Sequence, residues 1–164
     1  MSKIEFIIEL PSTKEQLMPV ITDYESYSTY LPDQLKNVRI LEKNGHEIVT
    51  QEEIFFSNIL KKPFLQKSSH KLIDSKTHES RIISGPANGS TLIIFFDDID
   101  NGTKITVNID LKLSLKAKFL LPLIKKWYKR IFTNLLYHIN NVAMTNIKKW
   151  VDMEPGKNII NWDN

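Results

Sequence analysis

The segment LKLSLKAKFLLPLIKKWYKRIFTNLLYHINNVAMTNIKKWV, residues 111–151, decides the architecture of this chain. It carries the longest helical pattern of the sequence, and most of what precedes it alternates as strands do. The helix is expected to begin between Lys116 and Pro122, since proline is tolerated in a first turn, and to run to about Val151. On a helical wheel the apolar half holds Trp127, Tyr128, Ile131, Phe132, Leu135, Ile139, Val142 and Ala143, and the polar half holds Lys125, Lys126, Lys129, Arg130, Thr133, Tyr137, Asn140 and Asn141. We therefore predict one long amphipathic helix covering a sheet.

The charge of the same segment differs from that of the rest of the chain. It holds nine Lys or Arg and no Asp or Glu, whereas the remaining residues hold 13 basic and 19 acidic side chains. Such asymmetry indicates a polyanionic partner on one side. An anionic membrane surface and ribosomal RNA both fit, and a solvated lysine-rich helix face is the simplest alternative. The predicted surface-docking residues are Lys125, Lys126, Lys129 and Arg130.

Seven strands are predicted before the helix. Residues 3–10 alternate, with Ile4, Phe6, Ile8 and Leu10 on one side, which is typical of a half-buried strand. Six more strands, joined by hairpins, are expected at 37–42, 46–56, 64–74, 79–84, 91–97 and 103–113. The result would be an antiparallel meander with apolar side chains on its concave face and the first strand at one edge.

Two short helical segments are expected after the first strand. Ser12 and Glu15 fit a capping box, so a helix should start at Thr13 and bury Leu17, Val20 and Ile21. Residues 23–31 are rich in tyrosine and should form a second short helix or a pair of turns that ends at Pro32.

Length and composition limit the classes of protein to consider. The 164 residues are expected to form one domain over residues 1–152, followed by a loosely ordered tail over 153–164. The lack of cysteine excludes disulfides, thiolate metal sites and thiol catalysis. Glu5 and Glu9 interrupt the first apolar segment, and no apolar run reaches the roughly 18 residues of a membrane span, so we expect a cytoplasmic protein.

A local motif adds a family resemblance. Val20-Ile21-Thr22-Asp23-Tyr24-Glu25-Ser26-Tyr27, followed by Tyr30-Leu31-Pro32, resembles a pattern of the START-like superfamily, also called the polyketide cyclase/dehydrase and lipid transport superfamily (SRPBCC). The most similar members are the coenzyme Q-binding and ribosome-association proteins, which usually continue Pro-Trp-Cys where this chain has Pro32-Asp33-Gln34. The resemblance covers residues 3–151. It implies an α+β helix-grip fold, in which a curved seven-stranded antiparallel sheet grips a long C-terminal helix around a cavity for a hydrophobic ligand.

We therefore expect the chain to bind and carry a hydrophobic small molecule, such as a lipid, a quinone or an isoprenoid-like compound. The pocket should measure roughly 300 Å³ or more, and a solid interior would instead favour an interaction protein. Glu52, Tyr128 and His138 would orient the ligand; Glu52 lines the cavity only if its strand does not hold it in water at a bulge or edge. The full set of predicted ligand-binding residues is Phe6, Glu52, Ile54, Phe56, Phe96, Ile109, Trp127, Tyr128, Ile131, Leu135 and His138.

An enzyme acting in the same cavity, of the cyclase, aromatase or dehydratase type, is the first alternative, and a ribosome- or RNA-associated interaction protein is the second. The enzyme would need two converging ionisable groups. The sequence indicates at most one inward histidine, His138, and one inward carboxylate, Glu52, while His46 and His78 lie at turns and are expected in solvent and His70 could face either way. No spacing of ligands indicates a metal site, and no cofactor is expected. We expect a binding protein, as a monomer or a weak dimer.

Overall fold

A seven-stranded antiparallel sheet forms the frame of the computed structural model, which describes residues 2–56 and 62–152. The strands are ordered β1-β7-β6-β5-β4-β3-β2, so consecutive hairpins run from β2 to β7 and β1 returns to the edge beside β7. In chain order the elements are β1 (Ser2–Leu10), α1 (Lys14–Ile21), the 3-10 helix η1 (Tyr24–Ser26), α2 (Tyr27–Tyr30), β2 (Leu35–Asn44), β3 (Glu47–Ile54), β4 (Phe64–Asp74), β5 (Thr77–Ser84), β6 (Thr91–Ile99), β7 (Gly102–Leu111), the 3-10 helix η2 (Lys118–Leu120) and α3 (Leu121–Asp152).

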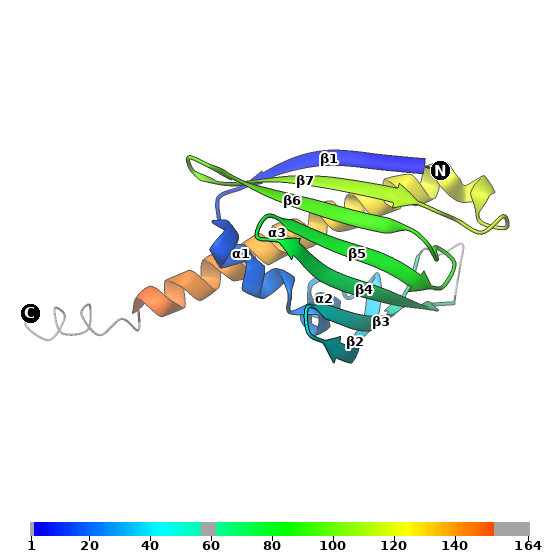
Figure 1. The fold of residues 1–164 in the computed structure, drawn as a ribbon, viewed down its shortest axis with the longest axis horizontal. Coiled ribbons are helices and arrows are strands. Elements are labelled where there is room, and N and C mark those ends of the chain that lie inside the picture. Colours follow the sequence, from blue (N-terminus) through cyan, green and yellow to red (C-terminus); the bar gives the residue numbers. More distant parts are fainter. Residues whose placement is uncertain (1, 57–61, 153–164) are drawn as a thin grey trace, which may run out of the picture.

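This architecture confirms the predicted α+β helix-grip arrangement of a seven-stranded antiparallel sheet and a long C-terminal helix. Helix α3 lies along one face of the sheet, and its C-terminal turns extend beyond the strands (Figure 1). Pro122 occupies its first turn, as expected. The predicted tail, 153–164, lies outside the described residues. Within the described residues, no helix combines the length and the hydropathy needed to cross a membrane.

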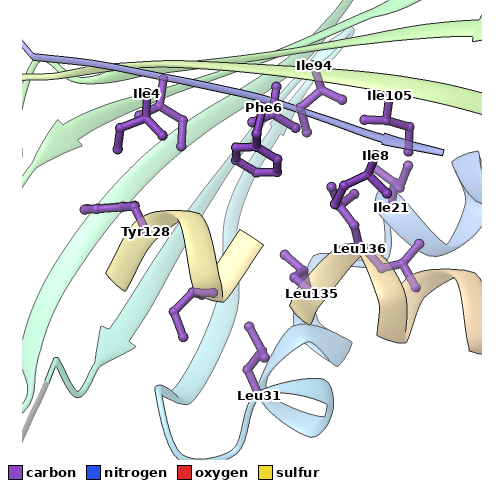
Figure 2. Packing of buried hydrophobic residues seen from close by; sticks show 14 of the residues in the cluster. Ile4, Phe6, Ile8, Ile21, Leu31, Ile94, Ile105, Tyr128, Leu135 and Leu136 are labelled. Carbon is purple, nitrogen blue, oxygen red and sulfur yellow. The ribbon is translucent and has the colours of Figure 1, made fainter. Parts of the chain in front are cut away.

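The core forms where α3 meets β1, β6 and β7. Alternate residues of β1 and β7 are buried, and the buried cluster includes Phe6, Ile105, Val107, Leu135 and Ile139. Figure 2 shows Phe6 of β1 pointing from the sheet toward the helix that carries Leu135. Burial of this apolar surface, at about 25 cal/mol per Å², stabilises the contact between the helix and the sheet.

The start of α1 differs from the prediction. Thr13, not Ser12, caps the helix: its hydroxyl accepts from the Gln16 backbone amide, and the Gln16 side chain accepts from the Thr13 amide. Ser12 is instead fully buried and donates a 2.6 Å hydrogen bond to Oδ1 of Asn140 on α3. The prediction that Asn140 faces solvent is therefore wrong, because the connection between β1 and α1 crosses α3 at this point.

The buried pair of Ser12 and Asn140 yields a stability prediction with an internal control. Asn140→Ala should lower the free energy of unfolding by about 1–3 kcal/mol, because it leaves the Ser12 hydroxyl buried without its partner. Asn141→Ala changes the same residue type at the next, exposed position of the same helix and should shift stability by less than about 0.5 kcal/mol. Urea unfolding of both variants gives the comparison, and equal effects would contradict a structural role for this hydrogen bond.

Candidate ligand-binding cavity

A cavity of about 130 Å³ lies between the sheet and α3. Every strand except β1 contributes to its wall, together with α1, η1, α2 and α3. The helix supplies mostly apolar and aromatic side chains. The residues that line the cavity are Ile21, Tyr24, Tyr27, Leu31, Leu35, Val38, Thr50, Glu52, Ile54, Gln66, Ser68, His70, His78, Ser80, Ile82, Ser90, Thr91, Leu92, Ile94, Ile109, Leu111, Trp127, Tyr128, Ile131, Phe132, Leu135, Leu136 and Ile139.

The size prediction of roughly 300 Å³ or more is wrong, although the interior is not solid. The cavity has less than half that volume because large side chains from the helix, Trp127, Tyr128 and Phe132, fill much of the space under the sheet. The hydrophobic pattern of a sequence identifies which faces meet, but it does not give the volume that the side chains leave empty.

Polar side chains form a stripe on the cavity wall, which corrects the expectation of a uniformly apolar concave face. The stripe follows the period-two alternation of three neighbouring strands. All of its members are buried, and they are Thr50 and Glu52 of β3, Gln66, Ser68 and His70 of β4, and His78 and Ser80 of β5. Sequence reasoning singled out only Glu52 from this set. The signal that was available is the run of polar residues two positions apart on three successive strands.

Hydrogen bonds link part of this stripe into a chain that ends at Glu52. Ser80 Oγ lies 2.7 Å from His70 Nδ1, and His70 Nε2 lies 2.8 Å from Thr50 Oγ1. The Thr50 hydroxyl donates to Oε1 of Glu52 at 3.2 Å. Since a hydroxyl has one proton, Thr50 must accept from His70 Nε2–H when it donates to Glu52, and His70 Nδ1 then accepts from Ser80. The donors in this chain all point toward the carboxylate.

Glu52 is only partly satisfied by the protein. Its Oε2 atom is buried and has no hydrogen-bond partner, and no Lys or Arg is among the described residues that line the cavity. Burial raises the pKa of the carboxyl from 4.5 to about 7, and the Ser68 and Thr50 hydroxyls oppose that rise. Glu52 is thus a carboxyl group that changes its charge near neutral pH.

The two histidines of the stripe are held neutral. Burial lowers the pKa of His70 from 6.5 to about 3 and that of His78 to about 4, with the neighbouring His78 adding to the shift of His70. His78 Nε2 pairs with the Tyr24 hydroxyl at 2.8 Å, and the Tyr24 ring stacks on His70 with centroids 4.2 Å apart. The prediction that His78 lies in solvent is wrong. Strand β5 starts at Thr77 rather than at Glu79, which turns His78 inward.

The structure brings together seven of the eleven residues predicted to bind ligand: Glu52, Ile54, Ile109, Trp127, Tyr128, Ile131 and Leu135. The other four do not line the cavity. Phe6 and Phe96 are buried elsewhere in the core, and Phe56 is half-buried with its ring 5.1 Å from that of Trp127. His138 is exposed and stacks on Tyr30 at 6.4 Å, so it does not orient a ligand in this cavity.

A separate surface carries the predicted docking residues. Lys126, Lys129 and Arg130 are exposed, and Lys125 is half-buried. Large apolar side chains stand beside them without cover: Leu115 is 83% exposed, Phe119 77% and Leu123 49%. The ion pairs found in residues 2–56 and 62–152 are Lys14–Glu15 and Arg81–Glu79, and neither includes a basic residue of α3.

Solved structures share this arrangement. The Zhui aromatase/cyclase from Streptomyces sp. R1128 matches with a TM-score of 0.76 at 12% identity, covering 89% of this chain and 95% of that one. The protein TTHA0849 from Thermus thermophilus matches at 0.75 and 13%, covering 88% and 99%. A START superfamily protein from Mycobacterium smegmatis matches at 0.68 and 13%, covering 87% and 97%. This chain has the helix-grip fold. No protein-family model and no curated protein sequence matches it.

The raised pKa of Glu52 predicts a pH-dependent stability. Between pH 4.5 and about 7 the carboxyl ionises in the unfolded chain but stays protonated in the fold, so stability falls as the pH rises through this window. Glu52→Gln cannot ionise, and its stability relative to wild type should grow by about 3 kcal/mol across the window. Urea unfolding at pH 4.5 and pH 8 gives the two differences.

The matched control is Glu53→Gln, the next residue of β3, which does not line the cavity. Its stability relative to wild type should hardly change between the two pH values. An advantage of Glu52→Gln that is the same at both would show that Glu52 has an ordinary titration.

Proposed function

We propose that this chain binds a small hydrophobic molecule in the cavity and carries it shielded from water. The observation that supports the proposal is the enclosed space under α3, with apolar walls on the helix side and a polar stripe on the sheet side. Ligand pockets commonly combine such walls with a few placed polar groups. The binding energy would come from burying apolar ligand surface, at about 25 cal/mol per Å².

The volume restricts the size of the ligand. A cavity of about 130 Å³ is close to the roughly 150 Å³ of an apolar cavity that accommodates benzene. The best fit is therefore a molecule of about one ring, or the ring of a larger molecule. A long lipid, quinone or isoprenoid chain would need α3 or its aromatic side chains to move away from the sheet.

Benzene is a suitable probe of the cavity. At ten times its dissociation constant it should add about 1.4 kcal/mol to the stability of the wild type, which corresponds to a rise in Tm of roughly 3–5 °C. Leu135→Trp should abolish this rise, because the larger indole occupies the space that the ligand needs. Tyr137→Trp places the same side chain at an exposed position of α3 and should leave the rise intact.

Circular dichroism of the variants tests whether Leu135→Trp keeps the fold, since overpacking typically costs about 1–3 kcal/mol. A folded wild type that shows no benzene-dependent rise, or a Leu135→Trp variant that keeps it, would refute binding in this cavity.

The polar stripe supports a second candidate function, an acid–base enzyme of the cyclase or dehydratase type. The sequence indicated at most one inward histidine, whereas Glu52, His70, His78 and Tyr24 all line the cavity. Glu52, with a pKa of about 7, could take or give a proton at neutral pH. Mass analysis of a bound natural ligand before and after release separates the two candidates, because a carrier returns its ligand unchanged.

The exposed apolar and basic side chains around the start of α3 support docking on an anionic membrane. Leu115 and Phe119 could enter the interface between headgroups and acyl chains, while Lys126, Lys129 and Arg130 meet lipid headgroups. The mixture favours a membrane over RNA, because phosphate contacts alone would not require exposed leucine and phenylalanine. A carrier docked in this way would exchange its ligand with the bilayer.

Charge reversal tests the docking. The triple variant Lys126→Glu, Lys129→Glu and Arg130→Glu should bind anionic vesicles more than a hundredfold more weakly, because each basic group near such a surface contributes about 1 kcal/mol. Stability should hardly change, since the three side chains are exposed. Flotation with phosphatidylserine-containing vesicles at several salt concentrations measures the binding, which should fall with salt.

The matched control reverses three exposed lysines away from this surface, Lys3, Lys43 and Lys67. It should keep most of the binding to vesicles. If the wild type does not float with anionic vesicles, the membrane proposal fails, and salt-sensitive sedimentation with ribosomes would then favour RNA.

A further inference from the structure

Two buried hydrogen-bond acceptors without partners lie side by side on the cavity wall. Glu52 Oε2 and Gln66 Oε1 each lack a donor, although both residues are more than nine-tenths buried. Glu52 and Gln66 are direct partners in the antiparallel register of β3 and β4, and both line the cavity. Opposite residues of such a pair have Cβ atoms about 4.5–5.5 Å apart, so one ligand group can reach both.

The protein has already assigned its nearby donors to other acceptors. The Thr50 hydroxyl donates to the other oxygen of Glu52, and the Gln66 side-chain amide donates to Ser68 Oγ at 3.4 Å. The lining has no Lys or Arg among its described residues that could neutralise Glu52. A buried acceptor that stays unpaired is costly, so this arrangement is incomplete without a donor from outside the chain.

We propose that the ligand carries an O–H or N–H donor at one end, which bonds Glu52 Oε2 and Gln66 Oε1, and an apolar body that lies against α3. This assignment rests on the proposed binding function and adds the chemical class of the ligand: a small apolar molecule with a hydroxyl or an amine. The remaining wall, with residues such as Ile131 and Leu135, offers only hydrocarbon to the body of the ligand.

Two pairs of probes isolate the contribution of the donor: phenol with benzene, and benzylamine with toluene. Within each pair the ring is kept and the donor is added. Phenol should bind the wild type about tenfold more tightly than benzene, because hydrogen bonds to charged or partly charged groups are among the stronger ones. Titration calorimetry, or the dependence of Tm on probe concentration, gives both dissociation constants.

The amine arm separates a cationic donor from a neutral one. Benzylamine should bind more tightly as the pH rises from 6 to 8, because Glu52 gains its charge near pH 7. His70 and His78, with pKa values lowered to about 3 and about 4, stay neutral in this range. Tyr24 and Tyr128 also stay neutral, since burial raises the pKa of both. Glu52 is therefore the described lining residue that titrates in the window.

Variants locate the donor site. Glu52→Gln keeps the shape but removes the charge, and it should lower the preference for phenol over benzene by threefold or more with little effect on benzene. Gln66→Met removes the second acceptor at similar length and should lower the same preference by a smaller factor. Glu53→Gln, with the same chemical change on the neighbouring residue outside the cavity, should leave the preference as in the wild type.

The outcomes separate this inference from the function on which it rests. A preference for phenol that Glu52→Gln diminishes supports a hydroxyl ligand, and a pH-dependent preference for benzylamine supports an amine. If benzene and toluene bind but neither donor-bearing probe binds more tightly, or if Glu52→Gln keeps the preference, the inference is overturned while the hydrophobic binding function stands. If none of the four probes binds, both are overturned.

Discussion

The packing of one long helix against the concave face of the sheet is the contact on which the rest of this structure depends. Helix α3 buries Ile131, Leu135 and Ile139 against strands that bury alternate residues toward it. The same side chains form both the core and the helix side of the cavity. The cavity is therefore a region where this packing is incomplete, and its size depends on how closely the aromatic residues of the helix approach the sheet.

Polar side chains account for the incomplete packing in chemical terms. A sheet face of valine and isoleucine could close on the helix without voids, whereas Glu52, His70 and His78 must keep hydrogen bonds within a buried space. Their mutual bonds satisfy most of these groups, and burial holds both histidines neutral. What remains unsatisfied on the sheet side is concentrated at Glu52 and Gln66. The protein thus presents an apolar space with chemistry at one side of it.

The fold followed from the sequence because its signals are local and repeated. Alternation in β1 and β7, the Asn-Gly turn before His46 and the wheel of α3 each predict one element, and together they leave one architecture. The candidate site followed only in part. Glu52 and the apolar residues of the helix were predicted from their faces, whereas Gln66, Ser68, His78 and Ser80 were not, because polar alternation on a strand normally indicates the solvent side. Ser12 and Asn140 were misplaced for a related reason: a contact between distant segments leaves no mark on the local pattern of either one.

The inward polar stripe has a consequence for the way β4 finds its partners. Most half-buried strands are held in place by apolar residues that would become exposed if the strand slipped by one residue. In β4 the inward residues are Gln66, Ser68 and His70, and Leu65 is exposed, so hydrophobic burial does not oppose such a slip. A slip would instead bury Lys67 and Lys71, two ammonium groups that the cavity could not neutralise. Lysines on the outer face of the native sheet therefore exclude the misaligned one.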